Sequence, residues 1–111
     1  MLKAYWAYDF TCDQPIEAIL AAFVAAGPWQ WRLCDSAVYG DYLNTRPKER
    51  VRVRVHEYPQ MVFVGPRDKG FSALLQIDAE SMATRSEIDD VFRRLLQGIN
   101  ATNMTEIEPY D

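Results

Sequence analysis

The chain has 111 residues, of which 49% are hydrophobic and 25% are charged, and its formal net charge is −4. This length and composition predict one globular domain over residues 1–111 and exclude an intrinsically disordered chain. The charge is uneven, because residues 46–54 hold five basic residues and one acid, a net +4 that leaves −8 on the rest of the chain. Such an acidic body argues against a nucleic-acid partner, since it repels polyphosphates.

The first predicted elements are a strand and a helix. Residues 2–10 alternate apolar and more polar side chains, which is the pattern of a β-strand. A helix is expected to follow with Pro15 in its first turn and with Asp13 or Thr11 as its N-cap. Gly27 should end this helix by taking the left-handed conformation that caps many helices.

The middle of the chain predicts strands joined by turns. Five strands are expected, over residues 29–33, 37–43, 50–57, 61–64 and 71–78. Asp35 and Ser36 should form a turn or bulge between the first two of these strands. Residues 44–49, with Pro47 among them, predict the loop of a hairpin.

The last predicted elements are a second helix and a closing strand. The helix should begin near Thr84, which can form a capping box with Glu87, and the closing strand is expected over residues 104–110. Hairpin-linked strands between two helices predict an α+β fold with an antiparallel sheet and both helices packed on one face. This is a ferredoxin-like (split βαβ) arrangement or an elaboration of it with extra strands. The pattern identifies no particular family.

The most distinctive stretch is the predicted strand over residues 50–57. Three valines alternate there with three arginines and the chain's one histidine: Val51, Val53 and Val55 against Arg50, Arg52, Arg54 and His56. Strict alternation predicts that the valines enter the core and that the cations share the opposite face. If the 44–49 loop closes symmetrically, Asp41 faces Arg52 and Tyr39 faces Arg54 across the hairpin. That register predicts one cross-strand ion pair and one cation–π pair.

Two interpretations of this strand remain open from the sequence. In the first, the arginines belong to a solvated sheet face whose ion pairs contribute little. In the second, the chain is a small non-catalytic binding protein that forms a homodimer or binds a protein partner through arginine and aromatic side chains. A small anion is a further candidate ligand. The expected partner-binding residues are Arg46, Lys48, Arg50, Arg52, Arg54, His56 and Tyr39.

The alternative function is a small-ligand-binding domain. Its pocket would lie between helix and sheet and would be lined by Trp29, Trp31 and Trp6. We predict no cofactor and no metal site, because one histidine and two separated cysteines cannot complete a zinc site. An enzyme is not expected either, since the one candidate pair, Cys34 with His56, has no local signature.

The predicted location is the cytoplasm. Cys12 and Cys34 are too few for a disulfide framework and lack CxxC spacing, which favours reduced thiols. The start of the chain has no apolar segment typical of a secretory signal. The longest apolar run, residues 18–27, is about half the length of a membrane span, so no membrane partner is expected.

Overall fold

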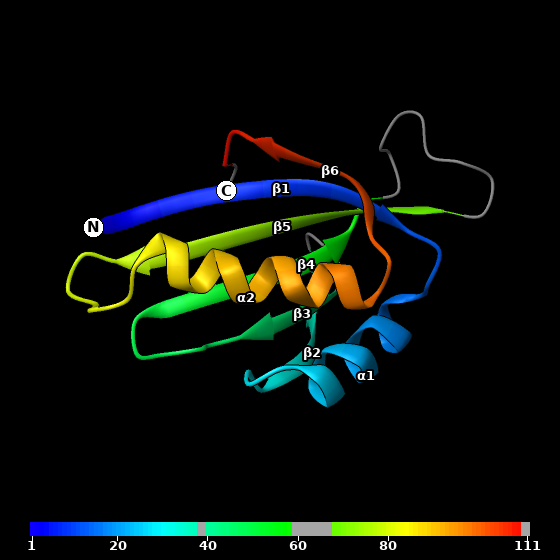
Figure 1. The fold of residues 1–111 in the computed structure, drawn as a ribbon, viewed down its shortest axis with the longest axis horizontal. Helices are drawn as coiled ribbons and strands as arrows, with labels where there is room; N and C mark the ends of the chain where they lie inside the picture. The colour runs from blue at the N-terminus through cyan, green and yellow to red at the C-terminus, as the bar shows by residue number, and fades with distance from the viewer. Residues whose placement is uncertain (38–39, 59–67, 110–111) are drawn as a thin grey trace.

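The computed structural model describes residues 1–37, 40–58 and 68–109. Within these ranges the chain forms six strands and two helices, which confirms the α+β class (Figure 1). In chain order they are β1 (Leu2–Cys12), α1 (Ile16–Ala26), β2 (Trp31–Ser36), β3 (Gly40–Thr45), β4 (Val51–Glu57), β5 (Lys69–Asp78), α2 (Arg85–Gly98) and β6 (Thr102–Ile107). The strand expected over residues 61–64 lies outside the described residues.

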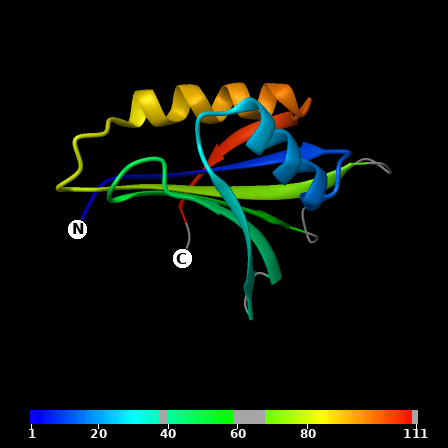
Figure 2. The same cartoon turned by 90° about the horizontal axis from the view of Figure 1, so that it is seen from below.

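The six strands form one antiparallel sheet in the order β2-β3-β4-β5-β1-β6. Figure 2 shows α1 and α2 on the same face of this sheet. We call the opposite face the helix-free face. The hairpin of β2 and β3 bends away from the helices, toward the side of the helix-free face (Figure 2).

The core lies between the sheet and the two helices. Trp6, Tyr8 and Phe10 alternate along β1 and are buried to 1% exposure or less. The Tyr8 ring stacks on Phe92 of α2 at 6.3 Å between centroids, and Phe10 stacks on Phe71 of β5 at 5.5 Å. Each large apolar side chain that folding removes from water contributes about 2–3 kcal/mol, so this aromatic row stabilises the pairing of β1 with β5 and the packing of α2 on β1.

The Thr84 cap predicted for the start of α2 is confirmed, and the helix buries one apolar stripe. Ile88, Phe92, Leu95 and Leu96 are buried against the sheet. At the N-terminus of the helix, the backbone N–H of Glu87 donates to Thr84 Oγ1 at 3.3 Å.

Loss of this cap should be measurable. We expect Thr84→Ala to lower the free energy of unfolding by about 1 kcal/mol, because one N–H of the first turn loses its acceptor. Urea unfolding followed by circular dichroism measures this change. Ser86→Ala, also exposed in the first turn, is the matched control, and an equal loss in both variants would contradict the assignment of the cap.

The capping interactions predicted for the two ends of α1 are wrong. Pro15 itself occupies the N-cap position, and no side chain caps the helix there. Gly27 ends the helix with φ −106°, which is not left-handed. Space explains the glycine instead, because a Cβ at this position would lie 2.9 Å from Cδ2 of Leu95 on α2.

The predicted break at Asp35 and Ser36 is also wrong. β2 runs without interruption through Ser36, which pairs with Gly40 at the start of β3. Gly40 has φ +71°, a conformation that glycine adopts without strain. Tertiary pairing with β3 therefore overrides the turn preference of an Asp-Ser pair.

Candidate anion-binding face

The alternation predicted for β4 is confirmed. Val51, Val53 and Val55 face the helices and are at most 1% exposed. Arg52 and Arg54 are half-buried on the helix-free face. Because β4 lies between β3 and β5, these two arginines are in the interior of the sheet and not on an edge strand.

The predicted register of the hairpin is wrong. Leu43 of β3 pairs with Val55 and not with Arg50, and the last partners before the loop are Thr45 and Val53. The observed pairing differs from the predicted pairing by an odd number of residues. Each side chain of β3 therefore lies on the opposite face of the sheet from the one predicted. Asp41 does not face Arg52 and instead lies opposite Asp35 of β2. Tyr39 lies outside the described residues.

The observed register brings together arginines from three different segments. Arg32 of β2 lies opposite Asn44 of β3, which lies opposite Arg54 of β4. Arg46 directly follows β3, and Arg52 Nε donates to Asn44 Oδ1 at 3.0 Å. We call Arg32, Asn44, Arg46 and Arg52 the arginine site.

No carboxylate forms an ion pair with an arginine of the arginine site within the part of the chain that the structure describes. Arg32 and Arg46 are exposed there and form no hydrogen bond or ion pair, and Arg52 bonds only to Asn44. Asn44 uses its oxygen as the acceptor, so its amide N–H groups remain as donors. The site therefore presents donors and positive charge together.

Two depressions adjoin at this site. One, of about 380 Å³, lies among Trp31, Arg32, Asn44 and Arg46. The other, of about 180 Å³, is lined by three arginines and one acid among these residues: Leu2, Arg46, Arg50, Val51, Arg52, Gln76 and Asp78. Arg46 belongs to both, so a ligand seated between them would contact guanidinium groups from more than one strand.

The remaining predicted cations are differently placed. Lys48 Nζ lies 2.8 Å from Glu87 Oε1, and Arg50 lies 3.4 Å from Glu80 Oε2 and 4.0 Å from Asp78 Oδ2. These pairs are exposed, so each contributes at most about 1 kcal/mol. Their charges are partly balanced within the chain, in contrast to those of the arginine site.

His56 is not part of the cationic surface. Its side chain is buried at 6% exposure. Burial, together with the positive charge of Arg54, lowers the pKa of His56 from 6.5 to about 4. The imidazole is therefore neutral at pH 7. Arg54 is itself engaged within the chain.

The three tryptophans of the predicted pocket belong to two different parts of the core. The Trp31 ring lies 4.9 Å from the Phe23 ring of α1 and 6.1 Å from the Trp29 ring, between centroids. Trp6 lies on β1, where its Nε1 donates to Asp89 of α2 at 3.0 Å. Trp31 Nε1 is buried and has no hydrogen-bond partner among the described residues. Of the three, Trp31 lines the larger depression of the arginine site.

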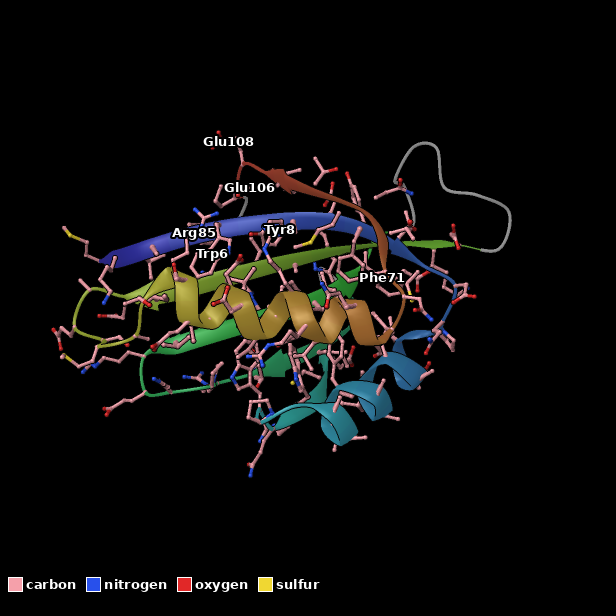
Figure 3. The ribbon with its side chains drawn as sticks, in the orientation of Figure 1. Trp6, Tyr8, Phe71, Arg85, Glu106 and Glu108 are labelled. Atoms are coloured by element: carbon pink, nitrogen blue, oxygen red, sulfur yellow. The ribbon has the colours of Figure 1, made fainter. Side chains whose placement is uncertain are left out.

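A polar cluster on the helix side of β1 was not predicted. Asp89 Oδ1 accepts a hydrogen bond from Tyr8 at 2.6 Å and one from Trp6, while Arg93 Nε donates to Asp89 Oδ2 at 2.6 Å. The guanidinium of Arg85 lies 5.0 Å from the centre of the Trp6 ring. It also donates to Glu106 of β6 at 2.7 Å. Figure 3 shows Trp6, Tyr8, Arg85 and Glu106 close together along β1.

The polar cluster holds α2 against β1. Burial raises the pKa of Tyr8, and the hydrogen bond with Asp89 raises it further, so the phenol keeps its proton at neutral pH. Arg93 Nη2 also donates to the Tyr8 oxygen at 3.0 Å. All these groups satisfy one another, which is the chemistry of a structural network.

The candidate catalytic pair is separated in the sheet. Cys34 lies opposite Tyr42, which in turn lies opposite His56. Two strand spacings separate their backbones by about 10 Å, so the two residues are not cross-strand neighbours. Cys34 and His56 therefore do not form a nucleophile and base in this arrangement.

Two further results complete the description of the site. None of the helices among the described residues is long and apolar enough to cross a membrane. Comparison with protein-family models and with curated proteins found no match. The functional interpretation therefore depends on the geometry and charge of the arginine site.

Proposed function

We propose that this chain is a non-catalytic binding protein whose arginine site holds the carboxylates of an acidic segment of a protein partner. The observation that carries the proposal is that Arg32, Arg46 and Arg52 face one region with no carboxylate partner among the described residues. Three uncompensated arginines are unexpected on a chain whose net charge is −4, and a bound anion would balance them.

The chemistry of the site suits carboxylates. A guanidinium group is a planar fork of donors that binds a carboxylate through two parallel hydrogen bonds. The Asn44 amide adds further donors, because its oxygen is occupied by Arg52. Arginines are also enriched among the residues that contribute most to protein–protein binding.

A protein partner fits the charge distribution better than a nucleic acid does. The chain outside residues 46–54 carries −8, which would repel the remainder of a long polyphosphate beyond the site. A short acidic segment needs to satisfy only the local positive charge. Local complementarity of this kind increases both specificity and the rate of association.

The test uses a fluorescein-labelled peptide rich in glutamate, with binding measured by fluorescence anisotropy. We expect Arg32→Glu combined with Arg46→Glu to weaken binding at least tenfold, because two attractive contacts become repulsive. Raising the salt concentration should weaken wild-type binding as well. The control is Arg94→Glu on α2, where the native Arg94 Nε donates to the backbone of Asp90.

Three results would contradict the proposal. They are equal binding by the double variant and the wild type, equal weakening in the Arg94→Glu control, and tighter binding of a single-stranded oligonucleotide of the same charge than of the peptide. A second copy of the chain is another protein that could bind the arginine site. Sedimentation of the wild type and of the double variant tests this by measuring their oligomeric state. A dimer that dissociates in the double variant would identify the second copy as the partner.

We also propose that the fold is an elaborated split βαβ arrangement and that the protein is cytoplasmic. β1 lies between β5 and β6, the two strands that α2 connects. This interleaving supports the ferredoxin-like interpretation, with β2 and β3 extending the sheet beyond β4. Cys12 and Cys34 are both free thiols, which suits a reducing compartment.

A further inference from the structure

A third depression continues the path of the first two. It has a volume of about 270 Å³, and two acids balance two cations in its lining: Lys48, Glu49, Arg50, Glu80, Ser81, Met82 and Ala83. Arg50 also lines the 180 Å³ depression of the arginine site. The three depressions are therefore joined in series, the first two at Arg46 and the last two at Arg50.

Two exposed aliphatic side chains line these depressions. Leu2 is 42% exposed and lines the middle depression, and Met82 is 94% exposed and lines the third. Both views show the start of β1, the loop before α2 and the loop before β4 at one end of the molecule (Figures 1 and 2). Isolated exposed apolar residues are ordinary, but these two line depressions that also contain arginine.

The backbone at Arg50 supplies an independent observation. Arg50 has φ +64°, a left-handed conformation that costs a residue with a side chain about 1–2 kcal/mol. Glycine would adopt it without strain. The chain nevertheless places arginine there, at the junction of two depressions, with Glu80 and Asp78 beside its guanidinium. Strained backbone of this kind concentrates at functional positions.

We propose that the three depressions hold one extended segment of the partner, in which acidic residues lie on one side of an aliphatic residue. The carboxylates bind the arginine site, and the aliphatic side chain packs on Leu2 and Met82. This inference rests on the proposed function and adds the composition of the recognised segment. Methionine suits such a contact, because its flexible side chain adapts to different apolar partners.

The experiment compares two labelled peptides of equal length and charge, both glutamate-rich, one ending in leucine and the other in serine. We expect the leucine peptide to bind the wild type about five- to tenfold more tightly, from partial burial of one aliphatic side chain. Met82→Ser combined with Leu2→Ser should remove this preference and leave binding of the serine peptide unchanged. Val24→Ser on α1 is the control, since Val24 is 53% exposed on a different surface.

The outcomes separate this inference from the proposed function. If both peptides bind the wild type equally and the arginine variants abolish binding, the aliphatic contact is wrong and the proposed function stands. A leucine preference that survives Met82→Ser with Leu2→Ser also overturns the inference. If neither peptide binds the wild type, the proposed function itself fails. Thermal melting of each variant confirms that the compared proteins are folded.

Discussion

Replacing Asp89 with alanine should lower the free energy of unfolding by about 3 kcal/mol. The carboxylate accepts hydrogen bonds from three groups that come from β1 and α2: Trp6, Tyr8 and Arg93. Alanine would leave the indole and the phenol without this acceptor. Urea unfolding at pH 7, followed by circular dichroism, measures the loss.

The size of this effect follows from burial. Trp6 and Tyr8 are each 1% exposed, and a buried donor that loses its partner costs about 1–3 kcal/mol. The side chain of Arg93 is 49% exposed, so water can replace its lost bond and it adds little. Asp90→Ala is the matched control, because Asp90 is exposed on the same helix and should change stability by less than about 0.5 kcal/mol. Similar losses at Asp89 and Asp90 would show that the network does not hold the helix.

The same network has a predictable pH dependence. Burial alone would raise the pKa of Asp89, but hydrogen bonds from Tyr8, Arg93 and Trp6 lower it below 3.8. A carboxyl whose pKa is lower in the folded than in the unfolded state stabilises the fold above its unfolded pKa. Its contribution is therefore lost as the pH falls below about 4. Asp89→Ala should unfold with less dependence on pH in this acidic range than the wild type.

The sequence predicts well those helices and strands in which apolar side chains recur at one regular spacing. The apolar stripe of α2 recurs at helical spacing, and the valines of β4 alternate at strand spacing. In both cases the period follows from backbone geometry alone. The buried faces of α2 and β4 could therefore be assigned before the sheet was known.

The composition of the arginine site could not be predicted, because it depends on the register of β3 with β4. The sequence does not fix where β3 ends. Thr45 extends that strand, and its hydroxyl donates to the carbonyl of Gln30, the residue before β2, at 2.7 Å. The register then brings Arg32 opposite Asn44. One signal was available in the sequence, since Arg32 follows Trp31 and must point away from the core if Trp31 points into it.

The polar cluster at Asp89 was missed for a different reason. Tyr8 is 81 positions and Trp6 is 83 positions from Asp89 in the sequence. An acid near the start of a helix usually interacts with the helix dipole, so the position of Asp89 in the sequence does not indicate a partner on β1. Only the packing of α2 across β1 shows that this carboxylate is a part-buried acceptor. Long-range polar contacts of this kind carry no periodic signal.

The stability of the protein should fall by about 2 kcal/mol between pH 7 and pH 5 through His56. The folded pKa of His56 is about 4, against 6.5 for an ordinary histidine. Between these values the unfolded chain binds a proton that the folded chain does not. The contribution is therefore present above pH 6.5 and is lost as the pH falls toward 4. Urea unfolding at intervals of half a pH unit measures the slope.

The surroundings of His56 make this assignment specific. Arg54 lies on the same strand and opposes protonation, while the cross-strand neighbours are Tyr42 on β3 and Ser72 on β5. The nearest carboxylate along this row is Asp9, which accepts the Ser72 hydroxyl at 2.9 Å. His56 is the chain's one histidine, and carboxylates with ordinary pKa values titrate mostly below pH 5. In His56→Gln the slope between pH 7 and pH 5 should therefore disappear, whatever the variant's stability at pH 7. An unchanged slope would mean that another group titrates in this range and that the imidazole can accept its proton without loosening the sheet beneath the arginine site.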